Sequence, residues 1–198
     1  TTTTTTTTTT LAPVRINSGG NQFTDVSGNI WAAEYGSVGN SVSSGFAVSG
    51  TENDLLFQDQ RFKKPSTGPL AYEIPLLGNG QYRVRLYFAE VCTCANATGA
   101  RIFSISIEGT VVESSFDIFG QVGFAAALIK EYNVIVADGN ATIVFTKNGG
   151  VEAPTVSAIE ILSVTTPTAA PTTSRPTSTA TTTTSRLQTT GAATSSAV

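Results

Sequence analysis

The sequence predicts an all-β fold, an antiparallel sandwich or barrel, and three observations carry this prediction. Apolar residues recur with a period of two in the best-patterned segments, and turns rich in Gly and Asn separate these segments at short intervals. No segment shows a convincing apolar face with helical spacing. About nine short strands with regularly spaced turns are typical of these two architectures.

The patterned part of the chain, residues 14–162, is expected to form one domain. It contains every Tyr and Phe and the only Trp, so it can build a core. Residues 1–13 form a Thr-rich linker, and residues 163–198 form a linker or stalk rich in Thr, Ser and Pro. We expect both flanks to be disordered, since neither can bury enough apolar surface to offset the entropy of ordering. The chain has no Met, so we expect it to be part of a longer polypeptide.

The expected strands can be taken in chain order. Short apolar segments predict strands at 14–16, 55–58, 71–74 and 111–113. Longer strands are predicted at 81–90 and 101–109, where apolar and polar side chains alternate as on a strand with one buried face.

The segment 131–150 predicts two strands joined by the turn Asp138-Gly139-Asn140, whose composition is typical of a hairpin. The last strand, 156–162, does not alternate cleanly, because Val156 and Glu160 fall on the same side. Either a bulge or an inward, paired Glu160 carboxylate would explain this. The only helical element that we expect is one turn within 124–130.

The charge of the domain argues against nucleic-acid binding. Residues 14–162 hold all 14 Asp and Glu residues but only nine of the 11 Lys and Arg residues, and no basic run interleaves with aromatic residues. Because binding to phosphates requires clustered cations, we expect no nucleic-acid partner. No apolar run approaches the ~20 residues of a membrane-spanning helix.

The chain has no His and only two cysteines, Cys92 and Cys94. The lack of His removes the commonest general base and metal ligand, and Cys-x-Cys supplies only two of the about four ligands of a zinc site. We therefore expect no metal site and no cofactor. The cysteines are either two free thiols or are bridged, by a strained bond to each other or by bonds to other chains.

Two Asn-x-Thr sequons, at Asn96 and Asn140, predict N-glycosylation. Together with the Thr-rich flanks they favour the secretory pathway. We therefore expect the protein in the extracellular space, at the cell surface or in the lumen of the endoplasmic reticulum. A longer parent chain would bring protein partners or a membrane association.

Seven stretches of residues 14–162 occur in the order and spacing of one known family: VRINSGG, TDVSGNIWAAE, NDLLFQDQRF, YRVRLYFAE, GARIFSISIEG, FDIFGQVG and SAIEIL. Together they resemble the malectin domain, a sugar-binding module. The resemblance implies a jelly-roll β-sandwich, similar to galactose-binding domains, that binds short glucose oligosaccharides in a cleft between loops. Relatives occur as a lectin of the endoplasmic reticulum, as modules of carbohydrate-active enzymes and as receptor ectodomains.

The resemblance also implies where ligand contacts lie. Aromatic residues of the family follow the Trp31 segment and end the QDQRF stretch, and a carboxylate before the last strand binds the sugar. The candidate contacts at these places are Trp31, Tyr35, Phe46, Phe62 and Glu152. As the only Trp of a sandwich, Trp31 can instead belong to the core.

The clearest departure from the family follows the Phe88-Ala89-Glu90-Val91 stretch. The family places an aromatic pair there, and this chain has Cys92 and Thr93. We expect both residues to border the cleft, with less stacking surface than the family usually offers.

Five charged residues in the stretches that carry the resemblance could be taken for functional groups: Arg61, Glu90, Arg101, Asp117 and Glu160. Because only 13% of the chain is charged, we expect these residues to pair internally and fix loops. The favoured pairs join Glu90 to Arg101 or to Arg61.

The leading hypothesis is a non-catalytic carbohydrate-binding module for glucose-type disaccharide units, within a larger secreted or surface protein. The alternative is a structural or adhesive module that has lost sugar binding. A glycosidase would need two suitably spaced carboxylates, and no motif singles out such a pair, so we expect no enzyme activity.

Overall fold

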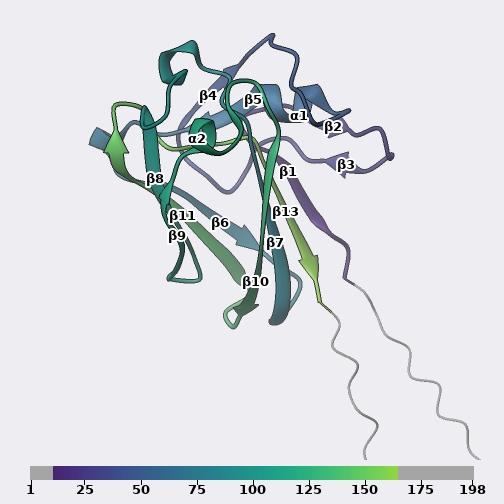
Figure 1. Cartoon of the computed structure of the whole chain (residues 1–198). Helices are drawn as coiled ribbons and strands as arrows, with labels where there is room; N and C mark the ends of the chain where they lie inside the picture. Colours follow the sequence, from purple (N-terminus) through teal and green to yellow (C-terminus); the bar gives the residue numbers. More distant parts are fainter. Residues whose placement is uncertain (1–10, 165–198) are drawn as a thin grey trace, which may run out of the picture. The chain divides into compact units, whose positions relative to one another are not determined.

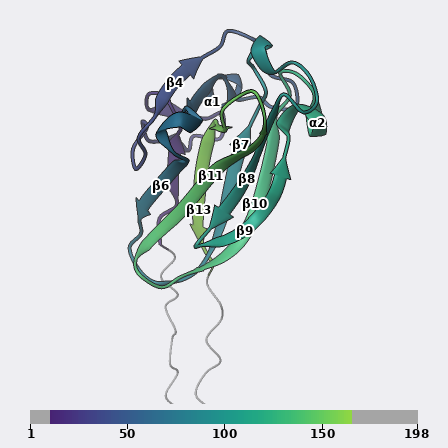
Figure 2. The ribbon, with the colours of Figure 1, turned by 90° about the vertical axis from the view of Figure 1, so that its left-hand side faces the viewer.

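The computed structural model describes residues 11–164, and two antiparallel four-stranded sheets form the body of this domain (Figure 1). The strand order is β1-β13-β7-β10 in one sheet and β6-β11-β8-β9 in the other, which faces the viewer in Figure 2. The strands of the first sheet are β1 (Val14–Asn17), β7 (Gly80–Phe88), β10 (Leu128–Val136) and β13 (Ala158–Ser163), and those of the second are β6 (Leu70–Pro75), β8 (Arg101–Ile107), β9 (Thr110–Phe116) and β11 (Asn140–Gly150). The predicted fold class is therefore confirmed. Residues 1–10 and 165–198, on which most of the expected linkers fall, lie outside the described residues.

The core between the two sheets follows directly from the alternating segments. In β8 every second residue is buried, from Arg101 to Ile107. Strand β7 buries every second residue from Tyr82 to Phe88 in the same way, and Tyr87 on its other face is buried as well. Four phenylalanine rings from both sheets meet in the core, and Phe88 and Phe116 have their centroids 4.8 Å apart. Burying apolar faces of this size is the main favourable contribution to folding.

One end of the sandwich carries the short elements (Figure 1). They comprise a three-stranded sheet in the order β12-β5-β4, a two-stranded sheet and two short helices. Their bounds are β2 (Phe23–Thr24), β3 (Ile30–Trp31), β4 (Asn40–Ser43), β5 (Asp59–Phe62), β12 (Thr155–Val156), α1 (Asp54–Gln58) and α2 (Ile118–Val122), with 3-10 turns η1 (Pro65–Thr67) and η2 (Thr93–Ala95). Strand β1 begins, and β13 ends, at the opposite end.

Two local predictions are wrong. Residues 55–58 belong to helix α1 and not to a strand, because consecutive residues Leu56 and Phe57 both pack into a second apolar cluster with Trp31 and Tyr87. An alternating strand could not bury both neighbours on one side. The segment 124–130 contains no helical turn. The helix lies earlier, at Ile118–Val122, where Asp117 caps its first turn by accepting a hydrogen bond from the Gly120 amide.

The turn at Asp138-Gly139-Asn140 is present, but it does not form the predicted hairpin. Strand β10 pairs with β7, whereas β11 pairs with β6 and β8, so the turn crosses from one sheet to the other. The neighbouring crossing, between β6 and β7, binds to it, because the Leu76 amide donates to the Gly139 carbonyl at 2.8 Å. The turn composition indicated a reversal of the chain, and long-range pairing decided which strands became neighbours.

The irregular pattern of the last strand has two causes. The chain breaks its strand at Ser157, with β12 pairing with β5 before the break and β13 pairing with β1 and β7 after it. This shift allows Val156 and Ile159 to enter the same core. Glu160 is also nearly buried and paired, since its carboxylate lies 2.7 Å from Arg15 Nε and 3.2 Å from Arg85 Nη1.

Candidate functional site

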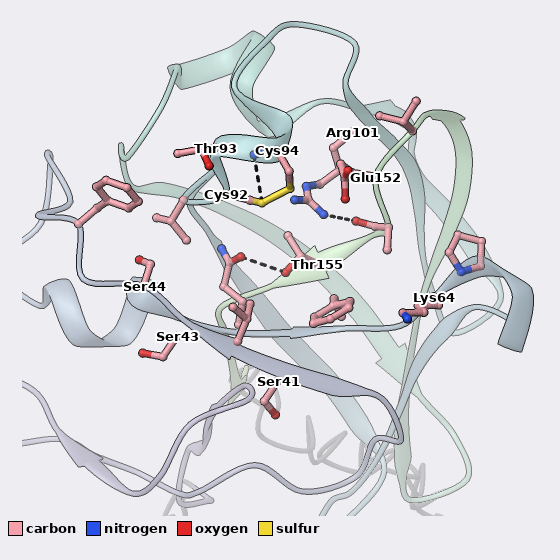
Figure 3. A pocket seen from close by; sticks show the side chains of 18 residues that line it. Ser41, Ser43, Ser44, Lys64, Cys92, Thr93, Cys94, Arg101, Glu152 and Thr155 are labelled. Atoms are coloured by element: carbon pink, nitrogen blue, oxygen red, sulfur yellow. Dashed lines mark hydrogen bonds between the residues drawn. A yellow bond between two sulfur atoms is a disulfide. The ribbon is translucent and has the colours of Figure 1, made fainter.

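A groove of about 660 Å³ opens at the end of the sandwich that carries the short elements (Figure 3). Segments that lie far apart in the sequence form its walls: strand β4, the end of β5, the loop after β7 and the loop before β12. The lining residues are Ser41, Val42, Ser43, Ser44, Phe46, Gln60, Phe62, Lys64, Pro65, Val91, Cys92, Thr93, Cys94, Arg101, Val151, Glu152, Ala153 and Thr155.

A buried ion pair fixes two of these walls. Arg101 Nε lies 2.7 Å from Glu90 Oε2, its Nη2 lies 3.2 Å from Oε1, and neither side chain is more than 6% exposed. Glu90 also accepts a hydrogen bond from the Cys92 amide, and Arg101 donates one to the Ala153 carbonyl. The pair therefore joins the loop after β7 to the loop that carries Glu152.

The floor of the groove is a saturated polar network. Gln60 donates to the Ala89 carbonyl at 2.5 Å and accepts from the Thr155 hydroxyl at 3.3 Å. Both side chains are almost fully buried, and such groups are stable only when they are hydrogen-bonded. Because these bonds are made within the protein, the floor holds the groove in shape.

The rim, in contrast, carries charged groups that have no partner among the described residues and could bind a ligand. Among residues 11–164, no partner lies within hydrogen-bonding or ion-pair distance of the Glu152 carboxylate or the Lys64 ammonium group. The Ser44 hydroxyl also has no hydrogen-bond partner among the described residues, but its oxygen is buried beneath the surface. A ligand with hydroxyl groups could therefore pair with Glu152 and Lys64.

The apolar surface of the groove comes from both aromatic and aliphatic side chains. The Phe46 ring is 42% exposed, and Phe124 supports it in an edge-to-face contact with centroids 5.0 Å apart. Phe62 is half-buried at the end of β5, where it pairs with Asn40 of β4 and Thr155 of β12. These rings can contact the apolar face of a ligand.

Cys92 and Cys94 form a disulfide across one intervening residue. Both cysteines line the groove, and Thr93 between them begins the 3-10 turn η2. In the structure the two cysteines are therefore neither free thiols nor bonded to other chains.

Two candidate contacts lie away from the groove, which corrects the expectation for them. Trp31 is only 3% exposed, packs edge-to-face against Tyr87 and donates from its indole nitrogen to Asp25. It is therefore a core residue of the second cluster. Tyr35 is 38% exposed but does not line the groove.

Arg61 and Asp117 have other partners than Glu90. Arg61 Nε lies 3.8 Å from Glu34, and the Arg61 guanidinium donates to the Ser41 hydroxyl of the β4 wall. Burial raises the pKa of Glu34, although the Gly19 amide, Arg61 and Tyr72 oppose this effect. Asp117 accepts from the Gly99 amide at 2.6 Å and so ties the loop after η2 to α2.

The two sequon asparagines lie at different places. Asn96 is exposed in the loop that follows the disulfide, and Asn140 is half-buried at the turn between the two sheets. Neither side chain lines the groove.

Several groove residues were not anticipated from the sequence. Strand β4 contributes Ser41, Val42 and Ser43, and Ser44 follows directly. All four residues of β4 are exposed, so the strand shows no alternation. Gln60 and Thr155 are buried polar residues. Of the two, only Gln60 lies in a stretch that carries the family resemblance, QDQRF.

Within residues 11–164, no helix is long and apolar enough to cross a membrane. In the same part of the chain, no group of three or more His, Cys, Asp and Glu side chains could hold a metal ion.

Comparison with known proteins supports the interpretation of the sequence. The model of the malectin domain family matches residues 13–159. Malectin-B of Xenopus laevis is 31% identical over 118 residues, which cover 57% of this chain and 41% of that protein. Receptor-like protein 4 of Arabidopsis thaliana is 30% identical over 127 residues, which cover 64% of this chain and 19% of that protein. The chain thus spans less than half the length of these relatives.

Solved structures share the fold. The extracellular domain of ANXUR2 from Arabidopsis thaliana superimposes with a TM-score of 0.69 at 18% identity, over 79% of this chain and 49% of that chain. A beta-glucuronidase of Bacteroides uniformis gives a TM-score of 0.67 at 22% identity, over 78% of this chain and 18% of that chain. At these identities the likeness concerns the fold alone. Because the family model matches most of the sequence, the chain belongs to the malectin domain family.

Proposed function

We propose that the groove binds short glucose-type oligosaccharides, and that the chain is a non-catalytic carbohydrate-binding module of a larger secreted or surface protein. One observation carries this proposal. Phe62, the pair Cys92 and Thr93, and Glu152 come from three separate stretches in which the family resemblance places ligand contacts. All four line one groove.

The chemistry of the groove supports this choice of ligand. A sugar has apolar C–H faces, which pack against rings such as Phe46 and Phe62, and hydroxyl groups, which need polar partners. Glu152 can accept hydrogen bonds from hydroxyl groups, and Lys64 can donate to them. A volume of about 660 Å³ lies in the usual range of small-ligand sites, roughly 300–1,000 Å³.

The proposed location is the secretory pathway, in the extracellular space, at the cell surface or in the lumen of the endoplasmic reticulum. The disulfide supports it, since disulfides persist mainly in oxidising compartments. The sequon at Asn96 is exposed, as N-glycosylation requires. Protein partners would act through the parent chain.

Binding of the full 198-residue chain to a glycan array, followed by calorimetric titration with maltose and nigerose, tests the proposal. Because the family's aromatic pair is missing at Cys92 and Thr93, we expect weak binding, with a Kd of about 1 mM, or about −4 kcal/mol. Phe62→Ala should abolish it. The matched control is Tyr35→Ala, which removes an exposed ring outside the groove and should leave binding unchanged.

Two other outcomes would contradict the proposal. If the folded chain binds no glycan, the structural or adhesive alternative becomes the better one, and the small residues at 92 and 93 already favour it. If the chain releases reducing sugar, the groove is catalytic.

A further inference from the structure

The disulfide between Cys92 and Cys94 faces the groove beside Thr93 (Figure 3). We propose that its two sulfur atoms are themselves a contact surface for the ligand, replacing the aromatic pair that this chain lacks. This inference rests on the proposed function, since it assigns part of the groove to the apolar face of a bound sugar.

The chemistry of a disulfide suits such a contact. Bridged sulfurs have lost the S–H donors of the thiols and are polarizable, so they pack against C–H groups by dispersion and compete little for hydroxyl groups. Val91 extends the same wall, and Phe46 and Phe62 supply the remaining apolar surface of the groove. The sulfur pair thus continues the apolar wall that begins at Val91.

The surrounding hydrogen bonds hold the sulfur pair in a defined place. The Cys92 amide donates to Glu90 Oε1 at 3.1 Å, and the Ala95 amide donates to the Cys92 carbonyl at 3.0 Å. Glu90 is fully buried and paired with Arg101, which also binds the carbonyl of Ala153. One anchor therefore positions both the disulfide and Glu152, so a sugar can meet an apolar surface and a carboxylate in a fixed relation.

A bridge that only pins the loop would be an alternative explanation, and a pair of variants separates the two roles. Cys92→Ala/Cys94→Ala removes the bridge but keeps the surface apolar, whereas Cys92→Ser/Cys94→Ser removes the bridge and makes the surface polar. If the sulfurs contact the sugar, the serine variant should bind several-fold more weakly than the alanine variant, and both should bind more weakly than the wild type. If the bridge only pins the loop, both variants should lose the same amount.

The measurement is calorimetric titration of the full chain with nigerose and maltose, after thiol titration has shown that the wild type has no free thiol. We expect about a tenfold loss for the serine variant. Asn96→Gln is the matched control, because it changes the same loop at a side chain that does not line the groove, and it should bind like the wild type. Equal affinities in both double variants, or no loss in either, would overturn the contact role.

Reduction of the wild type provides a second measurement that does not depend on whether the variants fold. Dithiothreitol supplies two electrons and two protons, becomes its cyclic disulfide and leaves two thiols at Cys92 and Cys94. We expect the reduced protein to bind more weakly, and oxidised glutathione to restore the bridge and the affinity while it is converted to two reduced glutathione molecules. Unchanged affinity after complete reduction would contradict the proposal. A fully oxidised wild type that binds no glycan would instead overturn the proposed function.

Discussion

Two buried carboxylates, Glu90 and Glu160, occupy contrasting regions of the molecule. Glu90 lies beneath the groove and binds loops together: its partners are Arg101 and the amide of Cys92. Glu160 lies within a sheet and binds strands together, since Arg15 and Arg85 are its neighbours in register on β1 and β7. The Tyr87 hydroxyl also donates to Glu160, at 3.2 Å.

The two sites differ in which interactions would remain if the carboxylate were removed. The strands around Glu160 have backbone hydrogen bonds of their own, and Arg85 is 34% exposed, so water can reach the arginine. The loops around Glu90 have fewer backbone bonds: the amides of Val151 and Glu152 donate to the Ala100 carbonyl, and no strand ladder follows. Arg101 is only 6% exposed. We infer that Glu90 determines the shape of the groove, whereas Glu160 adds stability to a sheet that forms without it.

The largest expected effect follows from replacing Glu90. Glu90→Gln leaves the buried Arg101 guanidinium without a counter-charge, which costs about 3–5 kcal/mol in the free energy of unfolding. Urea denaturation of the full chain measures this loss. Sugar binding should disappear in the same variant even where it remains folded, because the loops carrying Cys92 and Glu152 lose their common anchor. A variant with normal stability and no binding would instead identify Glu90 as a ligand contact.

Replacing Glu160 should have a smaller effect. Glu160→Gln should lower the free energy of unfolding by about 1–3 kcal/mol, the range for a buried hydrogen-bonding partner that is lost, because water solvates Arg85 and partly Arg15. Urea denaturation measures the loss, and titration with nigerose should give the same Kd as the wild type. Weakened binding would contradict the separation between the two regions.

Replacing Glu152 tests whether the Glu90–Arg101 pair supports sugar binding by positioning the Glu152 carboxylate. Glu152→Gln should weaken nigerose binding about tenfold, or about 1.4 kcal/mol, because a charged acceptor is exchanged for a neutral one. The melting temperature should not change, since the Glu152 side chain has no hydrogen bond to residues 11–164. A loss of stability would show that Glu152 belongs to the scaffold.

A third carboxylate, Glu34, has a more distant charged partner than Glu90 or Glu160, because Arg61 Nε lies 3.8 Å from it. Burial raises the pKa of Glu34 above its ordinary value of 4.5, so protonation favours the folded state. This stabilisation is complete below pH 4.5 and is lost as the pH rises through the higher pKa of the folded protein. We therefore expect the melting temperature of Glu34→Gln, relative to that of the wild type, to be higher at pH 7 than at pH 4. Melting temperatures across this range measure the difference, and a difference that does not vary with pH would contradict it.

The parts of the fold that the sequence predicted are those that depend on a local pattern. Residues 81–90 and 101–109 alternate because each strand has one buried face, and this pattern predicted β7 and β8. The segment 55–58 has the composition of a strand, but Leu56 and Phe57 fill the second cluster as consecutive residues of a helix. The turn at Gly139 joins two sheets, and the choice of neighbouring strand depends on contacts far away in the sequence.

The groove residues likewise divide into those that a sequence pattern indicated and those that it did not. Phe62, Cys92 and Glu152 were named because they occupy positions in recognisable stretches, and the structure places them around one groove. The serines of β4 and the buried Gln60 were not named, since exposed or hydrogen-bonded polar residues have no periodic signature. For Trp31 the sequence left two roles open, because an aromatic residue near a loop can serve either as a contact or as core. Its packing against Tyr87 and its burial show that it is core.

Arg15, Glu160, Arg85 and Glu131 form a row of charges across the first sheet, in register on β1, β13, β7 and β10. Replacing Glu131, at the β10 end of this row, should have the smallest effect. Glu131 faces Arg85 at 2.7 Å and Arg83 at 3.2 Å, and the hydrogen bond from Arg85 lowers the pKa of Glu131. The side chain is 42% exposed, so water and salt screen these pairs. Glu131→Gln should therefore leave the melting temperature unchanged at physiological salt, measured beside Glu160→Gln as the buried control from the same row. If Glu131→Gln lowers the melting temperature as much as Glu160→Gln does, the charges of the row stabilise the sheet as one unit. Burial would then not explain the difference expected between the two carboxylates.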